Sequence, residues 1–150
     1  MARKSTIQSR LKAAQLLEQQ GDLGAALTAY GKLTASDPLQ ELAWHRQMVI
    51  LRKLKKTEQE HQLIGKAIAS YQKAVLEMQK DWIQAHSEKV ESSRALAKML
   101  GLVDSEGLPI SSSEITAKWE NRRSLLAKRL KNSKSKPVQQ KNSKKQARPK

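Results

Sequence analysis

The stretch QQGDLGAALTAYGKLTASDPLQ, residues 19–40, carries the signals that decide the fold. Gly21 is typical of a helix end, because glycine adopts the left-handed conformation that stops a helix, and Asp22 can cap the next helix. Between these residues and Asp37-Pro38, apolar residues recur at helical spacing. Asp37-Pro38 predicts a further helix start, since Asp can accept bonds from unpaired amides and Pro has no N–H to leave unpaired. The stretch therefore predicts a complete helix between the end of one helix and the start of another.

Helical spacing continues on both sides of this stretch. Apolar residues from Ile7 to Leu17 predict a helix before it, and Gln40 would complete a capping box for the helix that starts at Asp37-Pro38. A second capping box, at residues 57–60, predicts the start of a fourth helix.

The second half of the chain is also expected to be helical. We expect two helices between residues 58 and 100, breaking near Lys80-Asp81, or one long bent helix in their place. A turn around Glu106-Gly107 and a cap at residues 111–113 would precede a last helix over about 114–131. No stretch alternates with period two, so the chain is predicted to be all-α with no sheet.

The order of residues in this first stretch resembles the tetratricopeptide repeat, a helical hairpin of about 34 residues. The matching residues are Gly21-Asp22 at the turn, Ala26, Tyr30 and Asp37-Pro38. A second unit begins with ELAW, residues 41–44, and supplies Ala67 and Tyr71. The resemblance implies a short solenoid of antiparallel hairpins, about 6–36 and 38–79, with further helices about 81–100 and 114–131. In such a solenoid the last helix would cap the stack, and Trp82 would open a degenerate third unit.

Charge divides the chain into a domain and a tail. The net charge is +15, but no acidic residue follows Glu120, and residues 121–150 hold 12 basic residues, so the first 120 residues carry only +3. We therefore predict a flexible segment over residues 1–5, a helical domain over residues 6–130, and a disordered Lys-rich tail over residues 131–150. Phe is absent, so the few aromatic residues are expected to anchor the core, namely Tyr30, Trp44, Tyr71, Trp82 and Trp119.

The sequence offers little for catalysis or cofactor binding. The absence of cysteine excludes disulfides, thiol nucleophiles and cysteine-ligated zinc or iron–sulfur centres. Phosphate-binding glycine loops are absent, and His45, His61 and His86 lack metal-ligand spacing. No apolar run approaches the 18 or so residues of a membrane span. We therefore expect a cytoplasmic protein that is not an enzyme and has neither a cofactor nor a membrane-spanning segment.

Two functions remain, and the first is protein binding. The resemblance implies a partner-binding groove on the first helix of each hairpin, and this surface would be basic, which favours an acidic peptide or helix or a C-terminal carboxylate. A groove of two or three units is short, so a homodimer is a further possibility. The alternative is that these residues form ordinary solvated helix faces. The implied groove residues are Lys12, Gln15, Gln19, His45, Arg46, Val49, Arg52 and Lys53.

The second function is association with RNA, DNA or a ribosome. The basic last helix and tail could bind phosphates without reading sequence, since interleaved aromatic residues for base stacking are missing. The alternative is a tail that only improves solubility. The candidate polyanion contacts are Arg122, Arg123, Lys128, Arg129, Lys131, Lys134, Lys136, Lys141, Lys144 and Lys145.

Overall fold

The computed structural model describes residues 2–105 and 113–135, and this part of the chain is helical with no strand. The all-α prediction is therefore confirmed. Six helices follow one another along the described chain: α1 (Ala2–Gln19), α2 (Leu23–Ser36), α3 (Glu41–Lys53), α4 (Thr57–Ala85), α5 (Ser87–Met99) and α6 (Glu114–Ser135).

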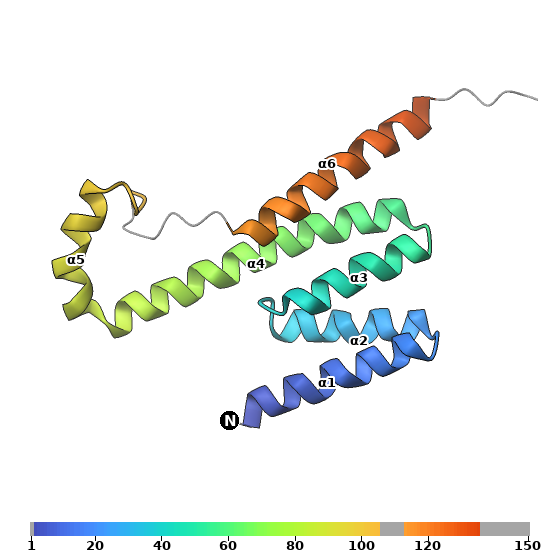
Figure 1. Ribbon diagram of the computed structural model, residues 1–150, viewed down its shortest axis with the longest axis horizontal. Coiled ribbons are helices and arrows are strands. Elements are labelled where there is room, and N and C mark those ends of the chain that lie inside the picture. Colours follow the sequence, from blue (N-terminus) through green and yellow to red (C-terminus); the bar gives the residue numbers. More distant parts are fainter. Residues whose placement is uncertain (1, 106–112, 136–150) are drawn as a thin grey trace, which may run out of the picture.

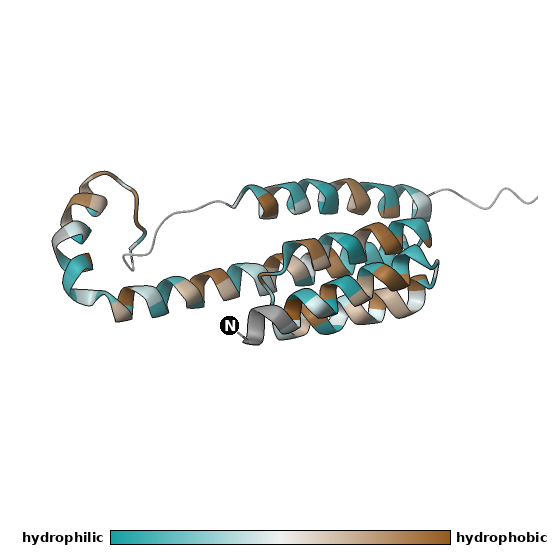
Figure 2. Ribbon diagram, turned by 60° about the horizontal axis from the view of Figure 1, so that its bottom comes forward, coloured by the Kyte–Doolittle hydropathy of each residue, from teal (hydrophilic) through white to brown (hydrophobic). Residues whose placement is uncertain are grey.

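The helices form a layered stack with one projecting part. Each of α1, α2 and α3 packs against the next helix in the chain, and the chain reverses direction at each connection (Figure 1). Helix α6 returns to lie along the first half of α4, which is longer than its neighbours. The second half of α4 leaves the stack and carries α5 at its end, as both views show (Figures 1 and 2).

The predicted turn after α1 is confirmed in detail. Gly21 has a φ of +83°, the left-handed conformation that side chains disfavour. The carboxylate of Asp22 accepts a hydrogen bond from the Ala25 amide at 3.0 Å and so caps α2. This turn brings α2 back along α1 and creates the first of two buried clusters. Its members come from α1, α2 and α3: Leu11, Ala14, Ala26, Tyr30, Leu33, Ala43 and Ile50.

The second buried cluster is closed by a helix distant in sequence. Its residues come from α3, α4 and α6: Trp44, Met48, Ile64, Ala67, Ile68, Trp119 and Leu126. The ring of Trp119 meets that of Tyr71 edge to face, with centroids 5.6 Å apart and planes at 84°. Ala67 is fully buried, and its small side chain allows α4 to pack closely against its neighbours. Helix α6 therefore covers the α3–α4 hairpin and completes its core.

One predicted helix start and one predicted capping box are wrong, whereas the fourth helix starts at residue 57, within the predicted stretch. Helix α3 begins at Glu41, because the Asp37 carboxylate accepts bonds from the Leu39 amide (3.1 Å) and Gln40 Nε2 (2.9 Å) and stabilises a turn instead. Thr57 is the first residue of α4 and provides no side-chain cap, since the residue before it occupies the cap position. The fourth residue of that capping box, Glu60, is buried and bonds to arginines instead of to the backbone of the helix start.

Some predicted boundaries also differ from the structure. The break in residues 58–100 occurs at His86, not near Lys80-Asp81. Residues 2–5 and 131–135 are helical, although the sequence predicted a flexible start and a disordered tail there. The predicted turn at Glu106-Gly107, the first two serines of the predicted cap, and residues 136–150 lie outside the described residues.

Trp82 does not occupy the position predicted for it. It lies inside α4, beyond the part covered by α6, and 57% of its surface is exposed. It therefore neither anchors a core nor opens a further hairpin. Its indole stacks on the ring of His86, with centroids 4.6 Å apart.

Candidate functional site

A groove of about 440 Å³ lies between α3 and α6. The apolar part of its lining consists of Met48 and Leu42 from α3 and of Ile115 and Trp119 from α6. Met48 and Trp119 are buried members of the second core, so they are held rigidly by packing. The polar residues that line the groove are Glu41, His45, Arg52, Lys118 and Arg122.

Two arginines at this groove share one buried carboxylate. Glu60 on α4 is only 1% exposed. Arg52 of α3 donates to its Oε1 through Nε (3.2 Å) and Nη2 (2.9 Å). Arg122 of α6 donates through Nε to Oε1 (3.0 Å) and through Nη2 to Oε2 (3.1 Å). Because two guanidinium charges meet a single carboxylate, the cluster keeps a surplus of one positive charge beside the groove.

The environment of Glu60 keeps its carboxyl group ionised at neutral pH. Burial raises the pKa of Glu60, but the hydrogen bonds and charges of Arg122 and Arg52 outweigh burial, so the pKa lies below its ordinary value. The ionised carboxylate then orients both guanidinium groups. Each guanidinium has a further nitrogen that takes no part in these bonds, and 47% of the Arg52 side chain is exposed.

A second carboxylate, the half-buried Glu18, pairs with the basic residues on the other side of α3. Glu18 of α1 accepts hydrogen bonds from Arg46 Nε (2.9 Å) and from the Tyr30 hydroxyl (3.2 Å), and Lys53 Nζ lies 3.6 Å from its Oε1. The hydrogen bond from Arg46 lowers the pKa of Glu18 below its ordinary value despite partial burial. This carboxylate reduces the positive charge of the surface between α1 and α3.

The structure therefore divides the predicted partner-binding residues. His45 and Arg52 line the α3–α6 groove, whereas Arg46 and Lys53 pair with Glu18. The rest lie outside the groove lining. They are Lys12 and Gln19, which are exposed on α1, Gln15, which is half-buried on α1, and Val49, which is half-buried on α3.

The predicted polyanion contacts are also divided. Arg122 belongs to the Glu60 cluster, and the guanidinium of Arg123 lies over Gly65 of α4, where an added Cβ would be 3.2 Å from Nη2. The remaining described cations are exposed on α6: Lys128, Arg129, Lys131 and Lys134. Residues Lys136, Lys141, Lys144 and Lys145 lie outside the described part of the chain.

Glu18 and Glu60 are the carboxylates that organise the basic residues, and the sequence reasoning missed both. A signal was available, because each lies on the apolar face of its helix: Glu60 is four residues before Ile64, and Glu18 is four residues after Ala14. A carboxylate at such a position requires a buried cationic partner. The capping-box interpretation of residues 57–60 hid this signal for Glu60.

The described ranges contain neither a metal-binding cluster nor a membrane-spanning helix. Nowhere in residues 2–105 and 113–135 do three His, Asp or Glu side chains gather in a way that could hold a metal ion. Within the same ranges, no helix has the length and apolarity to cross a membrane. No protein-family model matches the chain, and comparison with curated proteins and with solved structures gave no match.

Proposed function

We propose that this chain is a non-catalytic protein-interaction module that binds an acidic peptide or helix in the α3–α6 groove. The observation that carries the proposal is the pair Arg52 and Arg122, which flank an apolar groove and share the single carboxylate of Glu60. A carboxylate of the partner would balance the surplus charge, and an apolar side chain of the partner would contact Trp119 and Met48.

A tetratricopeptide-like arrangement is part of the same proposal. Ala26 and Ala67, the small residues of the two proposed repeats, are both fully buried. Tyr30 is buried between α1, α2 and α3, and Tyr71 contacts Trp119 of α6, so both tyrosines lie where successive hairpins would meet. In this interpretation α6 takes the place of the first helix of a third unit.

The proposed binding surface is narrower than the one expected from the sequence. Glu18 engages Arg46 and Lys53, so the surface between α1 and α3 offers less free positive charge to a partner. The α3–α6 groove combines surplus charge with an apolar floor. Both contributions are needed, because an exposed ion pair alone contributes only about 0–1 kcal/mol.

The test starts from peptides, because the partner is unidentified. Random peptides displayed on phage are selected against the full chain, and synthetic versions of the enriched peptides are measured by calorimetry. We expect enrichment of sequences with an acidic residue beside a large apolar residue. Arg52→Gln should weaken their binding at least about tenfold, since a charge-assisted bidentate contact is lost.

Arg10→Gln is the matched control, because Arg10 is an exposed arginine on α1, outside the groove. It should leave peptide affinity unchanged. Urea unfolding of both variants shows that the proteins are folded. The proposal fails if the enriched peptides lack acidic residues, or if both variants bind them as the unmodified chain does.

A second candidate function is binding of a polyanion by the exposed end of α6. From Asn121 to Ser135 this helix contains six basic residues and no acidic residue. None of the described carboxylates forms an ion pair with the four exposed cations from Lys128 to Lys134. Fluorescence anisotropy with a labelled single-stranded RNA tests this function. Replacing Lys128 and Arg129 by Gln should weaken binding. It should also make the slope of log affinity against log salt concentration shallower, by the amount that corresponds to about two lost phosphate contacts.

A further inference from the structure

A projecting arm, residues 76–105, exposes an unusual amount of apolar surface. We define the arm as the end of α4 from Leu76, helix α5 and the segment up to Ser105. Helix α5 turns away from α4 at its end and contacts it there, and the arm extends away from α1, α2 and α3 (Figure 1). Six large apolar side chains in the arm expose more than half of their surface: Met78, Trp82, Leu96, Met99, Leu100 and Leu102.

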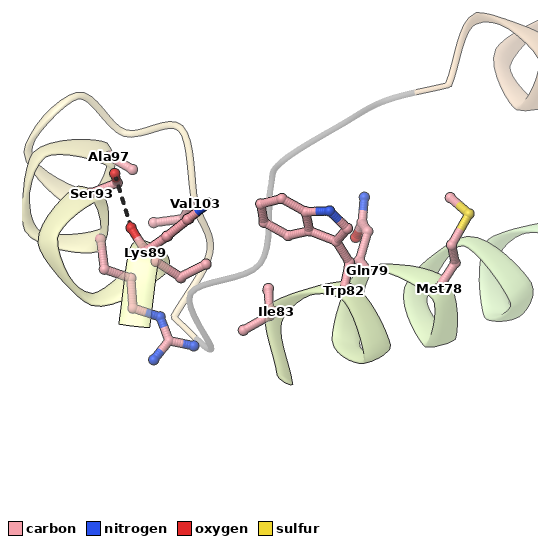
Figure 3. A pocket seen from close by; sticks show the side chains of 10 residues that line it. Met78, Gln79, Trp82, Ile83, Lys89, Ser93, Ala97 and Val103 are labelled. Carbon is pink, nitrogen blue, oxygen red and sulfur yellow. Dashed lines mark hydrogen bonds between the residues drawn. The ribbon is translucent and has the colours of Figure 1, made fainter. Parts of the chain in front are cut away.

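The arm also contains its own groove, with a volume of about 480 Å³. Trp82 and Ile83 contribute to it from α4, and Ala97 and Val103 face them from α5 and the segment after it (Figure 3). Met78 lies at the end of the groove nearer the helix stack (Figure 3). The exposed apolar area of the arm is on the order of several hundred Å², which in soluble proteins marks an interaction surface.

The charge of the arm differs from that of the rest of the chain. Residues 76–105 contain five acidic and four basic residues, a net charge of −1, so the other residues together carry +16. Two copies of so basic a chain repel each other wherever their basic surfaces meet. Residues 20–44, with one basic and three acidic residues, also escape this repulsion, but among their described large apolar side chains only Leu42 is exposed, whereas the arm combines a near-neutral charge with several exposed apolar side chains.

We propose that the arm is a homodimerisation surface that takes a second copy of this chain, arm against arm. Such a contact is self-complementary, as a two-fold interface requires. The arm and the basic end of α6 lie at opposite ends of the molecule (Figure 1), so arm-to-arm pairing keeps the two basic ends apart.

Sedimentation velocity of the full, nuclease-treated chain tests this proposal over a range of concentrations. We expect a concentration-dependent species of twice 16.9 kDa. Raising the salt from about 0.1 M to 1 M should strengthen the association, because salt screens repulsion between the basic parts and leaves an apolar contact intact. A chain that remains monomeric at about 100 μM, some hundredfold above a micromolar dissociation constant, overturns the proposal and would mean that the arm binds a different protein.

Matched charge substitutions locate the interface. Met78→Glu in the arm and Leu125→Glu on α6 are the matched pair, because the two side chains are 53% and 52% exposed. Met99→Glu is a second arm variant, at a side chain that is 86% exposed and can change without loss of packing. Both arm variants should raise the dimer dissociation constant at least about tenfold. Leu125→Glu should leave the constant unchanged.

Two outcomes contradict the arm as the interface. Either both arm variants dimerise as the unmodified chain does, or Leu125→Glu disrupts the dimer as strongly as they do. Circular dichroism shows that all three variants retain their helix content. Arg52→Gln should not change the dimer, so failure of the peptide-binding proposal and failure of this one are distinguishable.

Discussion

Arg122 of α6 donates two hydrogen bonds to Glu60 of α4, at 3.0 and 3.1 Å, across 62 residues of sequence. Arg52 of α3 reaches the same carboxylate, so one buried side chain connects three helices. Apolar packing through Leu126 and Trp119 attracts α6 to the hairpin, whereas the paired hydrogen bonds fix its rotation and register. The same bonds aim both arginines at the groove, so they link the stability of the fold to the chemistry of the proposed binding site.

Replacing Glu60 by Gln should destabilise the protein by about 2–3 kcal/mol. The change leaves two arginines without a compensating charge, but both side chains are partly exposed and can turn toward water, so the loss is below the 3–5 kcal/mol of a fully buried pair. Urea unfolding measures the loss. Glu58→Gln is the control, because Glu58 is an exposed carboxylate in the same helical turn, and its free energy of unfolding should change little. Equal effects of the two substitutions would show that the Glu60 cluster does not connect the helices.

The free energy of unfolding should fall in acid through Glu18 and Glu60. Both folded-state pKa values lie below the ordinary value, because hydrogen bonds from arginines favour the charged forms. The stabilisation is therefore complete above the unfolded-state pKa and is lost as the pH falls through the lower, folded-state values. Urea midpoints measured from neutral to strongly acidic pH should show this decline.

Substitution of single carboxylates identifies the source of this acid sensitivity. Glu60→Gln should make the decline shallower, because one of the two groups no longer titrates. Glu114→Gln should leave the curve almost unchanged, since Glu114 is exposed and its ion pair with Lys118 is screened by water. An identical decline in Glu60→Gln and the unmodified chain would assign the acid sensitivity to other groups.

Tyr30→Phe should cost about 1 kcal/mol of stability, the usual net contribution of an intramolecular hydrogen bond. The buried Tyr30 ring would remain in place, but its hydroxyl would no longer donate to Glu18. Tyr71→Phe should cost less, because the bond from its hydroxyl to Glu41 is exposed to water. Thermal unfolding of the two variants compares them directly, and the reverse order would contradict the burial difference between the two bonds.

Gly65→Ala should stabilise α4 by up to about 1 kcal/mol, the difference in helix propensity between alanine and glycine. The three atoms nearest to the new methyl group would all belong to the guanidinium of Arg123, at 3.2–3.4 Å, and the end of a flexible side chain can move by a few tenths of an ångström. The gain should be larger in an Arg123→Ala background, which a double-mutant cycle measures. A loss of stability in both backgrounds would mean that the α4–α6 contact is tighter than this geometry.

Local signals explain which parts of the fold were predictable. Gly21 and Asp22 decide their turn through backbone conformation and one short-range hydrogen bond, so the sequence alone predicts it correctly. Asp37 and Glu60 have equally good local signals for capping a helix. The Asp37 side chain instead stabilises a turn, and the Glu60 side chain instead bonds to arginines of other helices. The resulting errors are a late start of α3 and a missing cap on α4.

Helical periodicity alone could not locate the core. Trp82 and Met99 keep the spacing of a buried face, yet both are exposed because no described helix covers the arm. Trp119 has the same kind of signal and is buried, because α6 returns to the hairpin. The pairing of Arg52 and Arg122 with one carboxylate depends on this return as well, so the candidate site was only partly predictable from the sequence.

The return of α6 also determines the order in which the protein can assemble. Helices α1, α2 and α3 bury their shared cluster through neighbours in the chain, so this half can form as soon as it is synthesised. The cluster that contains Trp44 and Ile64 is complete only once Trp119 is present, and Trp119 follows Trp44 by 75 residues. Contacts between such distant residues form slowly. A growing chain therefore exposes the apolar α3–α4 face to solvent until α6 has been synthesised. During that interval the unfinished protein is most prone to aggregate and to bind chaperones.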